Sequence, residues 1–246
     1  MDGQGSMISV VLPVYNEASC ISAVLDELQA SLTFARSAEI VIVDDGSTDD
    51  TPALLTTFAS THPASRLLQL SPNSGQSAAF WAGIQAAAGD IIVLMDADGQ
   101  NDPADIEKCV SALAQADICC GYRAHRQDTF SKRIGSKLAN RLRRAVLKDE
   151  IIDTGCSMKA FRAPLLKTLQ YWEGMHRFLP VLASLQGATI IQIPVSHRSR
   201  FSGTSKYTNF GRLKRTIWDL FGVRWLKKRT RRFRVIPLTP ENGARP

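Results

Sequence analysis

The chain has 246 residues, of which 44% are hydrophobic and 22% charged, proportions typical of a soluble globular protein. The composition excludes a mostly disordered chain, and no apolar stretch approaches the roughly 18 residues that a membrane-spanning helix requires. The first six residues are small and polar, unlike a signal peptide, and the five cysteines lack Cys-x-x-Cys spacing. We therefore expect a cytoplasmic protein of one large domain, with reduced, buried thiols and no zinc site.

The net charge of +7 is unevenly distributed along the chain. Residues 1–197 contain 16 Lys and Arg against 21 Asp and Glu, whereas residues 198–234 contain 13 Lys and Arg against one acid, Asp219. A segment this one-sided indicates an anionic partner. A phosphate-bearing ligand or an anionic membrane surface is favoured over nucleic acid.

Strands and helices alternate in the first hundred residues. Short apolar runs predict strands at residues 8–12, 39–43, 67–70 and 91–95. Apolar residues at helical spacing predict helices at residues 18–34, 51–58 and 78–88. This order predicts an α/β fold with a Rossmann-like, doubly wound and mostly parallel sheet.

The pattern is less regular beyond residue 98. A helix is predicted at residues 103–113, a strand at 117–121, a basic helix at 132–146 and a last strand at 189–195. Residues 197–207 then place Gly, Thr and Ser between two groups of basic residues. We expect this segment to be a flexible loop that closes over a phosphate.

Three of the predicted strands end in polar clusters. These clusters are Pro13-Val14-Tyr15-Asn16-Glu17, Asp44-Asp45-Gly46-Ser47-Thr48-Asp49 and Asp96-Ala97-Asp98-Gly99-Gln100. Ligands of open α/β sheets bind beyond the carboxyl ends of the strands, so the clusters are expected to converge on one site. The carboxylates of Asp96 and Asp98 are ligands of the kind that Mg²⁺ or Mn²⁺ prefers, although a lone Asp-x-Asp can also be an acidic turn.

Six motifs occur in the order found in family 2 inverting glycosyltransferases, and the chain resembles most closely the polyprenyl (dolichyl) phosphate sugar synthases. Besides the three polar clusters, the motifs are Asn73-x-Gly75, Gly155-Cys156-Ser157-Met158-Lys159 and residues 197–207. The resemblance covers about residues 7–207 and implies a GT-A glycosyltransferase domain there. It also implies a divalent metal ion, a nucleotide sugar donor and a polyprenyl phosphate acceptor.

The resemblance implies a role for individual residues. The nucleotide contacts would be Pro13, Tyr15, Glu17, Asp44, Asp45 and Asp96. The ligands of Mg²⁺ or Mn²⁺ would be Asp96, Asp98 and Gln100, and the catalytic residues at the diphosphate would be Asp96, Asp98, Arg200 and Lys206. Arg123, Arg133 and Ser136 match the positions that hold the acceptor phosphate. His197 and Arg177 are weaker candidates for substrate contacts.

A phosphate acceptor is already an anion at neutral pH and needs no general base. The members of the family that glycosylate hydroxyls usually present a carboxylate base and a Gln-x-x-Arg-Trp motif, and the sequence shows neither. Three alternatives stay open. They are transfer to a saccharide hydroxyl in cell-envelope polysaccharide synthesis, a sugar nucleotidyltransferase, and a non-enzymatic module that binds nucleotides or nucleic acid.

Residues 208–236 combine apolar residues at helical spacing with many basic residues. Such a basic amphipathic segment is typical of a helix in a membrane interface, and it can equally pack on its own domain. We expect peripheral attachment to the inner face of the cytoplasmic membrane, with a membrane protein as a further candidate partner. Residues 237–246 are expected to be a disordered tail.

Overall fold

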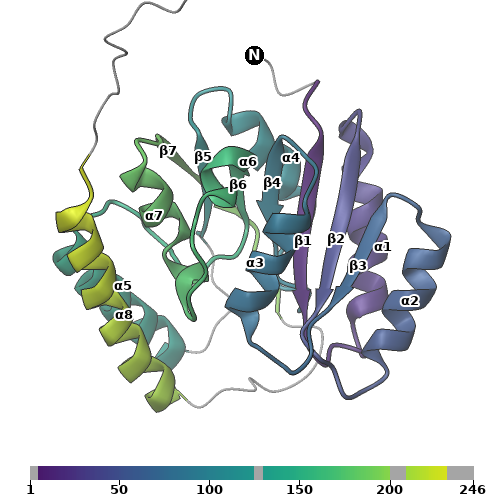
Figure 1. Ribbon diagram of the computed structural model, residues 1–246, viewed down its shortest axis with the longest axis horizontal. Helices are drawn as coiled ribbons and strands as arrows, with labels where there is room; N and C mark the ends of the chain where they lie inside the picture. The colour runs from purple at the N-terminus through teal and green to yellow at the C-terminus, as the bar shows by residue number, and fades with distance from the viewer. Residues whose placement is uncertain (1–4, 125–129, 200–208, 232–246) are drawn as a thin grey trace, which may run out of the picture.

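The computed structural model describes residues 5–124, 130–199 and 209–231 as a seven-stranded sheet between two layers of helices (Figure 1). The strand order is β3-β2-β1-β4-β6-β5-β7. The strands are β1 (Ile8–Val14), β2 (Ala38–Asp44), β3 (Ser65–Gln69), β4 (Ile91–Leu94), β5 (Ile118–Arg123), β6 (Lys159–Arg162) and β7 (Ile190–Val195). Two of the expected catalytic residues, Arg200 and Lys206, and the expected disordered tail at residues 237–246 lie outside the described residues.

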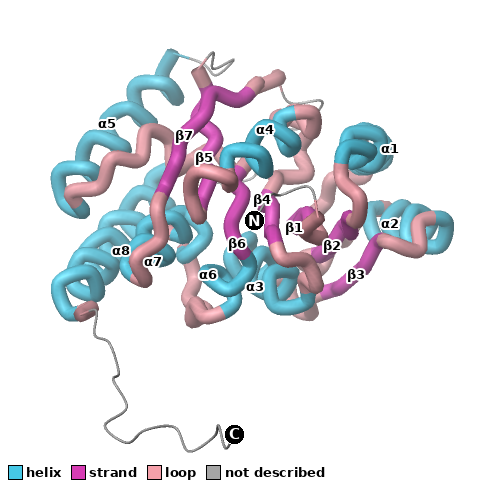
Figure 2. The backbone as a smooth tube through the Cα atoms, turned by 90° about the horizontal axis from the view of Figure 1, so that it is seen from above, coloured by secondary structure: helices cyan, strands magenta, loops and turns pink. Residues whose placement is uncertain are grey.

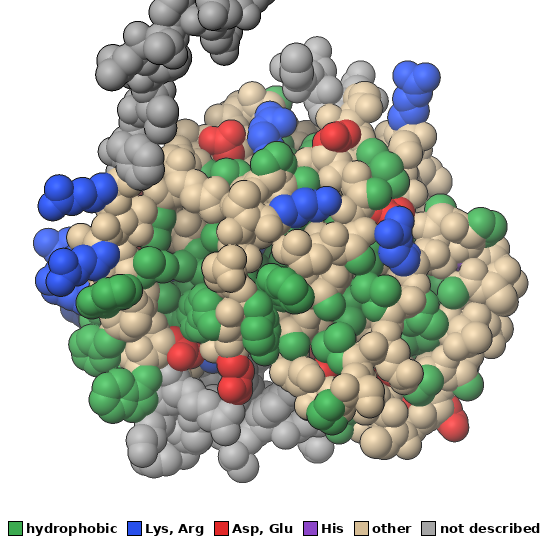
Figure 3. All heavy atoms as spheres, in the orientation of Figure 1, with side chains coloured by type: hydrophobic (Ala, Val, Ile, Leu, Met, Phe, Trp, Pro, Cys, Tyr) green, Lys and Arg blue, Asp and Glu red, His purple; other side chains and the backbone are tan. Residues whose placement is uncertain are grey.

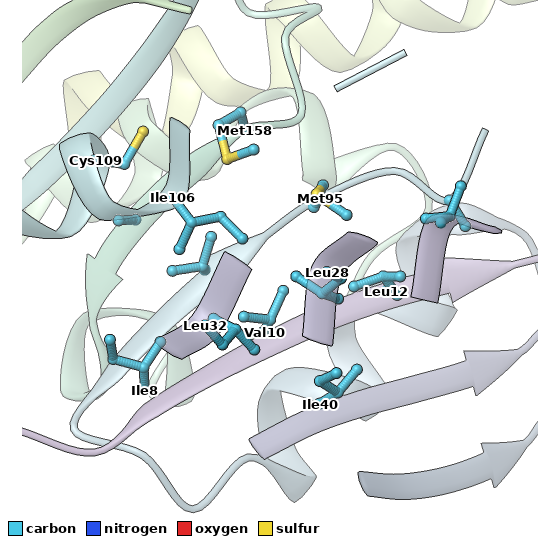
Figure 4. Packing of buried hydrophobic residues seen from close by; sticks show 14 of the residues in the cluster. Ile8, Val10, Leu12, Leu28, Leu32, Ile40, Met95, Ile106, Cys109 and Met158 are labelled. Carbon is cyan, nitrogen blue, oxygen red and sulfur yellow. The ribbon is translucent and has the colours of Figure 1, made fainter. Parts of the chain in front are cut away.

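The first four strands are parallel, as predicted, and the three inner ones, β1, β2 and β4, are largely apolar on both faces. In β1, alternate side chains enter opposite layers: Val10 and Leu12 belong to one buried cluster and Val11 to the other. Figure 4 shows Val10 and Leu12 packing near Leu28 and Leu32, which come from the helical segment after β1.

The two helical layers cover the two faces of the sheet (Figure 2). One layer contains α1 (Ile21–Ser31), the short helix η1 (Leu32–Phe34), α2 (Thr51–Thr61) and α4 (Asp105–Ala112). The other contains α3 (Gln76–Ala86), α6 (Ala163–Lys167), the short helix η2 (Met175–Arg177) and α7 (Leu179–Leu185). Two long helices, α5 (Phe130–Leu147) and α8 (Asn209–Arg229), lie side by side next to this second layer.

Strand β6 was not predicted from the sequence. It lies between β4 and β5 and pairs antiparallel with both. It has four residues and begins and ends with a basic residue, Lys159 and Arg162, so it lacks the apolar run that identifies the other strands. Its register places Lys159 opposite Leu94, at the carboxyl end of β4.

The five cysteines are buried and none forms a disulfide, which confirms the expected thiols. In the described ranges, no helix combines the length and the apolarity that crossing a bilayer requires.

Candidate functional site

The turns after β1 and β2 are joined by hydrogen bonds. The backbone N–H of Asn16 donates to Ser47 Oγ at 2.9 Å, and Asn16 Oδ1 accepts from the Thr48 N–H at 2.7 Å. Asn16 has a φ of 53°, a left-handed conformation that asparagine tolerates better than most residues. The structure thereby brings the first two polar clusters together and fixes the half-buried Tyr15 and Glu17 on either side of Asn16.

The carboxylates at the end of β2 hold neighbouring backbone in place. Asp45 accepts hydrogen bonds from two backbone N–H groups of the loop 73–75, at 2.7 and 2.8 Å, and Asp44 accepts from the Gln69 amide at 2.9 Å. Burial raises the pKa of Asp45, and these hydrogen bonds oppose the rise. The expected contact of Asp44 or Asp45 with a nucleotide base stays a prediction.

Asp96 and Asp98 follow β4 and are both half-buried. Gln76 Nε2 donates to Asp96 Oδ1 at 2.7 Å, and the Gln100 N–H donates to Asp98 Oδ1 at 3.1 Å. Burial, and next the negative charge of Asp98, raise the pKa of Asp96 to about 6, while a hydrogen bond from Ser157 lowers it. A carboxylate whose charge is disfavoured by a second carboxylate beside it fits a divalent cation, which would neutralise both.

The same turn contains Gln100, the third expected ligand, which is half-buried. In the described part of the chain, no group of three or more His, Cys, Asp or Glu side chains is arranged to hold a metal ion. A pair of carboxylates suits Mg²⁺ or Mn²⁺ sites in which substrate phosphates and water complete the coordination.

A pocket of about 180 Å³ opens beside Asp96. Its walls come from α3, from the ends of β4 and β6, from the segment 154–157 and from η2. The lining residues are Gln76, Phe80, Leu94, Asp96, Thr154, Gly155, Cys156, Ser157, Lys159, His176 and Arg177. The volume is below the roughly 300–1,000 Å³ of pockets for drug-sized ligands, so it suits a unit as small as one sugar ring.

Sequence reasoning gave no role to three polar residues of this pocket, Gln76, Lys159 and His176. Lys159 is 3% exposed, and its Nζ donates to the backbone carbonyls of Thr154 and Cys156. Lys159 is the last residue of the Gly155–Lys159 motif, and this position was the available signal for it. The contact of Gln76 with Asp96 had no such signal, because it depends on how α3 lies on the sheet.

Arg123, the last residue of β5, makes a two-pronged ion pair with Asp153. The two N···O distances are 2.7 and 3.0 Å, and the side chains are 13% and 7% exposed. A Cβ added at Gly155 would lie 2.9 Å from Arg123 Nη2, so the guanidinium packs against the pocket wall. The other two residues expected at the acceptor phosphate, Arg133 and Ser136, lie on α5, and their side chains are outside the described structure.

The segment after β7 is attached to the turn that carries the carboxylate pair. His197 forms an isolated antiparallel bridge with Asn101, and the Arg198 N–H donates to the carbonyl of Gln100 at 2.9 Å. The Arg198 guanidinium pairs with Asp102 at 2.9 Å. These contacts bring the start of the basic segment to the carboxylate pair, and they give His197 a structural partner.

Comparison with known proteins reveals related sequences. The model of the family Glycosyl transferase family 2 matches residues 9–170. An undecaprenyl-phosphate 4-deoxy-4-formamido-L-arabinose transferase of Pectobacterium carotovorum is 36% identical over 217 residues, which are 87% of this chain and 66% of that protein. A dodecaprenyl-phosphate galacturonate synthase of Rhizobium johnstonii is 36% identical over 227 residues, which are 89% of this chain and 67% of that protein. The chain therefore spans about two thirds of the length of these relatives.

Solved structures share the fold at lower sequence identity. The crystal structure of glucosyl-3-phosphoglycerate synthase from Mycobacterium tuberculosis, in complex with Mn²⁺, uridine diphosphate and glucosyl-3-phosphoglycerate, is 22% identical with a TM-score of 0.70. The match covers 91% of this chain and 80% of that one. A mannosyltransferase from Pyrobaculum calidifontis, in complex with GDP-mannose and Mn²⁺, is 21% identical with a TM-score of 0.63, covering 92% and 65%.

Proposed function

The chain belongs to glycosyl transferase family 2, and from this premise we propose that it transfers a sugar from a nucleotide diphosphate donor to a polyprenyl phosphate. The observation that carries the proposal is the Asp96 and Asp98 pair at the carboxyl end of β4, of which Asp96 lines a pocket the size of a sugar ring. The two relatives of 36% identity are named for sugar transfer to polyprenyl phosphates, which supports the same acceptor class here.

The catalytic domain in this proposal is residues 7–207. Asp96 and Asp98, with Gln100, would hold Mg²⁺ or Mn²⁺, and both structural neighbours described above contain Mn²⁺. The metal would supply positive charge beside the donor diphosphate as the bond to the sugar breaks. Arg200 and Lys206 are assigned to the same diphosphate. In support, Arg200 is two residues from Arg198, whose N–H binds the Gln100 carbonyl.

The nucleotide would lie along the turns after β1 and β2, against Pro13, Tyr15 and Glu17 and near Asp44 or Asp45. A carboxylate at the end of β2 accepts hydrogen bonds from the base edge in this assignment. The hydrogen bonds between these two turns support it, because they hold the turn that carries Tyr15 and Glu17 against the turn that follows Asp44 and Asp45.

The acceptor phosphate oxygen attacks the anomeric carbon with inversion, and the nucleoside diphosphate leaves from the opposite face. A phosphate monoester is ionised at neutral pH, so the chain has no proton to remove from the nucleophile. Arg123 is assigned to the acceptor phosphate, with Arg133 and Ser136. The ion pair with Asp153 supports this role for Arg123, because it fixes the guanidinium against the pocket wall.

Helix α8 is proposed to dock on an anionic membrane surface at the cytoplasmic face, where a polyprenyl phosphate is embedded. Trp218 is 70% exposed and Trp225 62% exposed, while Leu220 and Val223 of the same helix are buried. Since consecutive residues are about 100° apart around a helix, Trp218 and Leu220 face nearly opposite directions. The last turn adds basic residues, including the exposed Lys228. The helix thus packs on its own domain and presents a second apolar side.

The proposal is tested with radiolabelled nucleotide sugars, undecaprenyl phosphate and Mg²⁺ or Mn²⁺. We expect one donor to yield a lipid-linked sugar, and Asp98→Ala to lower kcat/KM by at least about a hundredfold because the diphosphate loses its metal. Asp90→Ala is the matched control, since Asp90 is an exposed carboxylate at the opposite end of β4 and accepts from the Met7 N–H. Product formation by a saccharide in place of the lipid phosphate, or equal rates for Asp98→Ala, would contradict the proposal.

A further inference from the structure

Lys159 is a buried cation of the pocket, and its charge acts on Asp96 in the same lining without forming an ion pair with it. The ammonium group has three N–H donors, and two of them are directed at the carbonyls of Thr154 and Cys156. Within the described residues, no carboxylate lies within ion-pair distance of Nζ. A buried ammonium without an anionic partner is costly, so an anion that enters the pocket is strongly favoured there.

The charges assigned in the proposed function leave Lys159 without an ion-pair partner when the metal ion and the donor diphosphate are bound. Asp96 is the acid among the lining residues, and in the proposed function a divalent cation neutralises it together with Asp98. The donor diphosphate is matched by Arg200 and Lys206 in the same proposal. Arg123 already has Asp153 as its ion-pair partner. Lys159 is therefore available to pair with a further negatively charged group.

A second donor on the pocket wall comes from His176. Ser77 Oγ accepts from the Gly174 N–H at 2.9 Å and lies 2.6 Å from His176 Nδ1. Ser77 is 3% exposed, so its hydroxyl hydrogen needs a partner, and Nδ1 is within reach. This assigns the acceptor role to Nδ1 and the ring proton to Nε2, which makes His176 a hydrogen-bond donor through its other nitrogen.

We propose that Lys159, assisted by His176, forms an oxyanion site in the pocket, which binds a charged group of a substrate other than the donor diphosphate. The inference rests on the proposed function and adds a specificity-determining residue to it. Two groups share the required chemistry. One is a carboxylate on the transferred sugar, as in a uronic acid, and the other is the phosphate of the acceptor.

Binding of small anions tests the site without turnover. Inorganic phosphate and glucuronate are added separately to the full chain, and the thermal unfolding midpoint is measured, with glucose as the neutral probe. At least one anion is expected to stabilise the wild type and Lys167→Gln, and neither to stabilise Lys159→Gln. Lys167 is a matched control because its Nζ also donates to a backbone carbonyl, that of Ala87, away from the pocket lining. Equal stabilisation of Lys159→Gln, or none of the wild type, would overturn the site.

Kinetics then identify the source of the anion. A charge-assisted hydrogen bond contributes about 1.5–3 kcal/mol, so its loss corresponds to about a 10- to 100-fold effect. If the anion is a sugar carboxylate, Lys159→Gln lowers kcat/KM by this factor for a uronic acid donor and not for the neutral hexose on the same nucleotide. If it is the acceptor phosphate, KM for polyprenyl phosphate rises by this factor with every donor.

A purely structural role for Lys159 gives a different result. Loss of its bonds to the 154–156 segment would lower the rates with all donors and acceptors by one common factor, and that outcome contradicts the proposal. Lys159→Arg keeps the charge and is expected to recover at least part of the selective effect. A wild-type chain that is stabilised by the anions but turns over no nucleotide sugar would refute the proposed function and leave the anion site intact.

Discussion

Individual carboxylates in this protein fix loop geometry by accepting hydrogen bonds from the backbone. Asp117, just before β5, accepts from both the N–H and the hydroxyl of Thr189, at 2.9 and 2.8 Å, and thereby joins the chain before β5 to the chain before β7. The Thr189 N–H bond is the main reason that the pKa of Asp117 is lowered, and Arg162 adds a smaller effect. The ionised form of Asp117 is the form that stabilises the fold.

Asp117→Asn is expected to lower the free energy of unfolding by about 1 kcal/mol at pH 7, because Asp117 is partly exposed and its bonds are screened by solvent. The folded pKa lies below the unfolded value, so this contribution is present above the unfolded pKa and is lost as the pH falls through the folded pKa. Urea unfolding at pH 7 and at about pH 3 should therefore show a smaller difference between mutant and wild type in acid. Glu107→Gln, at an exposed position of α4, is the control, and a difference that grows in acid would contradict the assignment.

At the same scale, the sequence identified the carboxylate pair because two acids end an apolar run. It also located the turns that the structure joins to each other through Asn16. It gave no role to Lys159, whose Nζ donates to the nearby carbonyls of Thr154 and Cys156. It also missed Gln76, which acts through a contact with Asp96 in a segment distant in sequence. Ser157 likewise acts through contacts with a distant segment of the sequence, because its Oγ accepts from the Asp96 N–H at 3.2 Å and from Asn101 Nδ2 at 2.7 Å.

Among the elements, α3 lies so close to the sheet that only glycine fits at position 83. A Cβ at Gly83 would overlap the Val11 side chain of β1 and lie 3.1 Å from Val43 of β2. Close packing here positions Gln76, at the first turn of α3, over the carboxylate pair. The geometry of the site thus depends on a residue that does not touch it.

Gly83→Ala tests this packing. Alanine favours a helix over glycine by about 1 kcal/mol, whereas overpacking costs about 1–3 kcal/mol, so the overlap with a β-sheet side chain should prevail. We expect a net loss of up to about 2 kcal/mol and a lower thermal midpoint in differential scanning calorimetry. Gly222→Ala on α8 has open space around the new Cβ and should instead stabilise the protein slightly. A Gly83→Ala protein at least as stable as wild type would show that α3 can move away without cost.

The predicted elements show which helices and strands the periodicity of apolar residues can identify by itself. The parallel strands β1 to β4 and the helices between them were predicted because apolar runs and helical spacing continue for several turns or residues. The elements beyond β5 that were not predicted are short: β6 has four residues, α6 five and α7 seven. Their apolar residues are buried against α3 and the sheet, and that packing, rather than local pattern, determines their conformation.

At the scale of the whole molecule, α8 connects the pocket to the surface. Arg177, which lines the pocket, donates to Thr216 Oγ1 of α8 at 2.9 Å. Arg224 Nη1 donates to the carbonyl of Val146 at 2.6 Å and Lys227 Nζ to that of Leu147 at 2.8 Å, so α8 is held on the end of α5. Figure 3 shows hydrophobic side chains gathered over one part of α8 and basic ones over another. A membrane bound there would lie next to the pocket, on the side where Arg177 contacts α8.

The double variant Trp218→Ala/Trp225→Ala tests the membrane role of this surface. Each exposed tryptophan is expected to contribute about 1–2 kcal/mol when it enters the interface, so binding to vesicles of phosphatidylglycerol and phosphatidylcholine should fall at least about tenfold in a sedimentation assay. Trp81→Ala removes an exposed tryptophan of α3 and should bind as wild type does. Because Leu220 and Val223 stay buried, the double variant should keep its thermal midpoint. Undiminished sedimentation would mean that α8 serves only to pack against α5, and that another surface of the protein binds the vesicles.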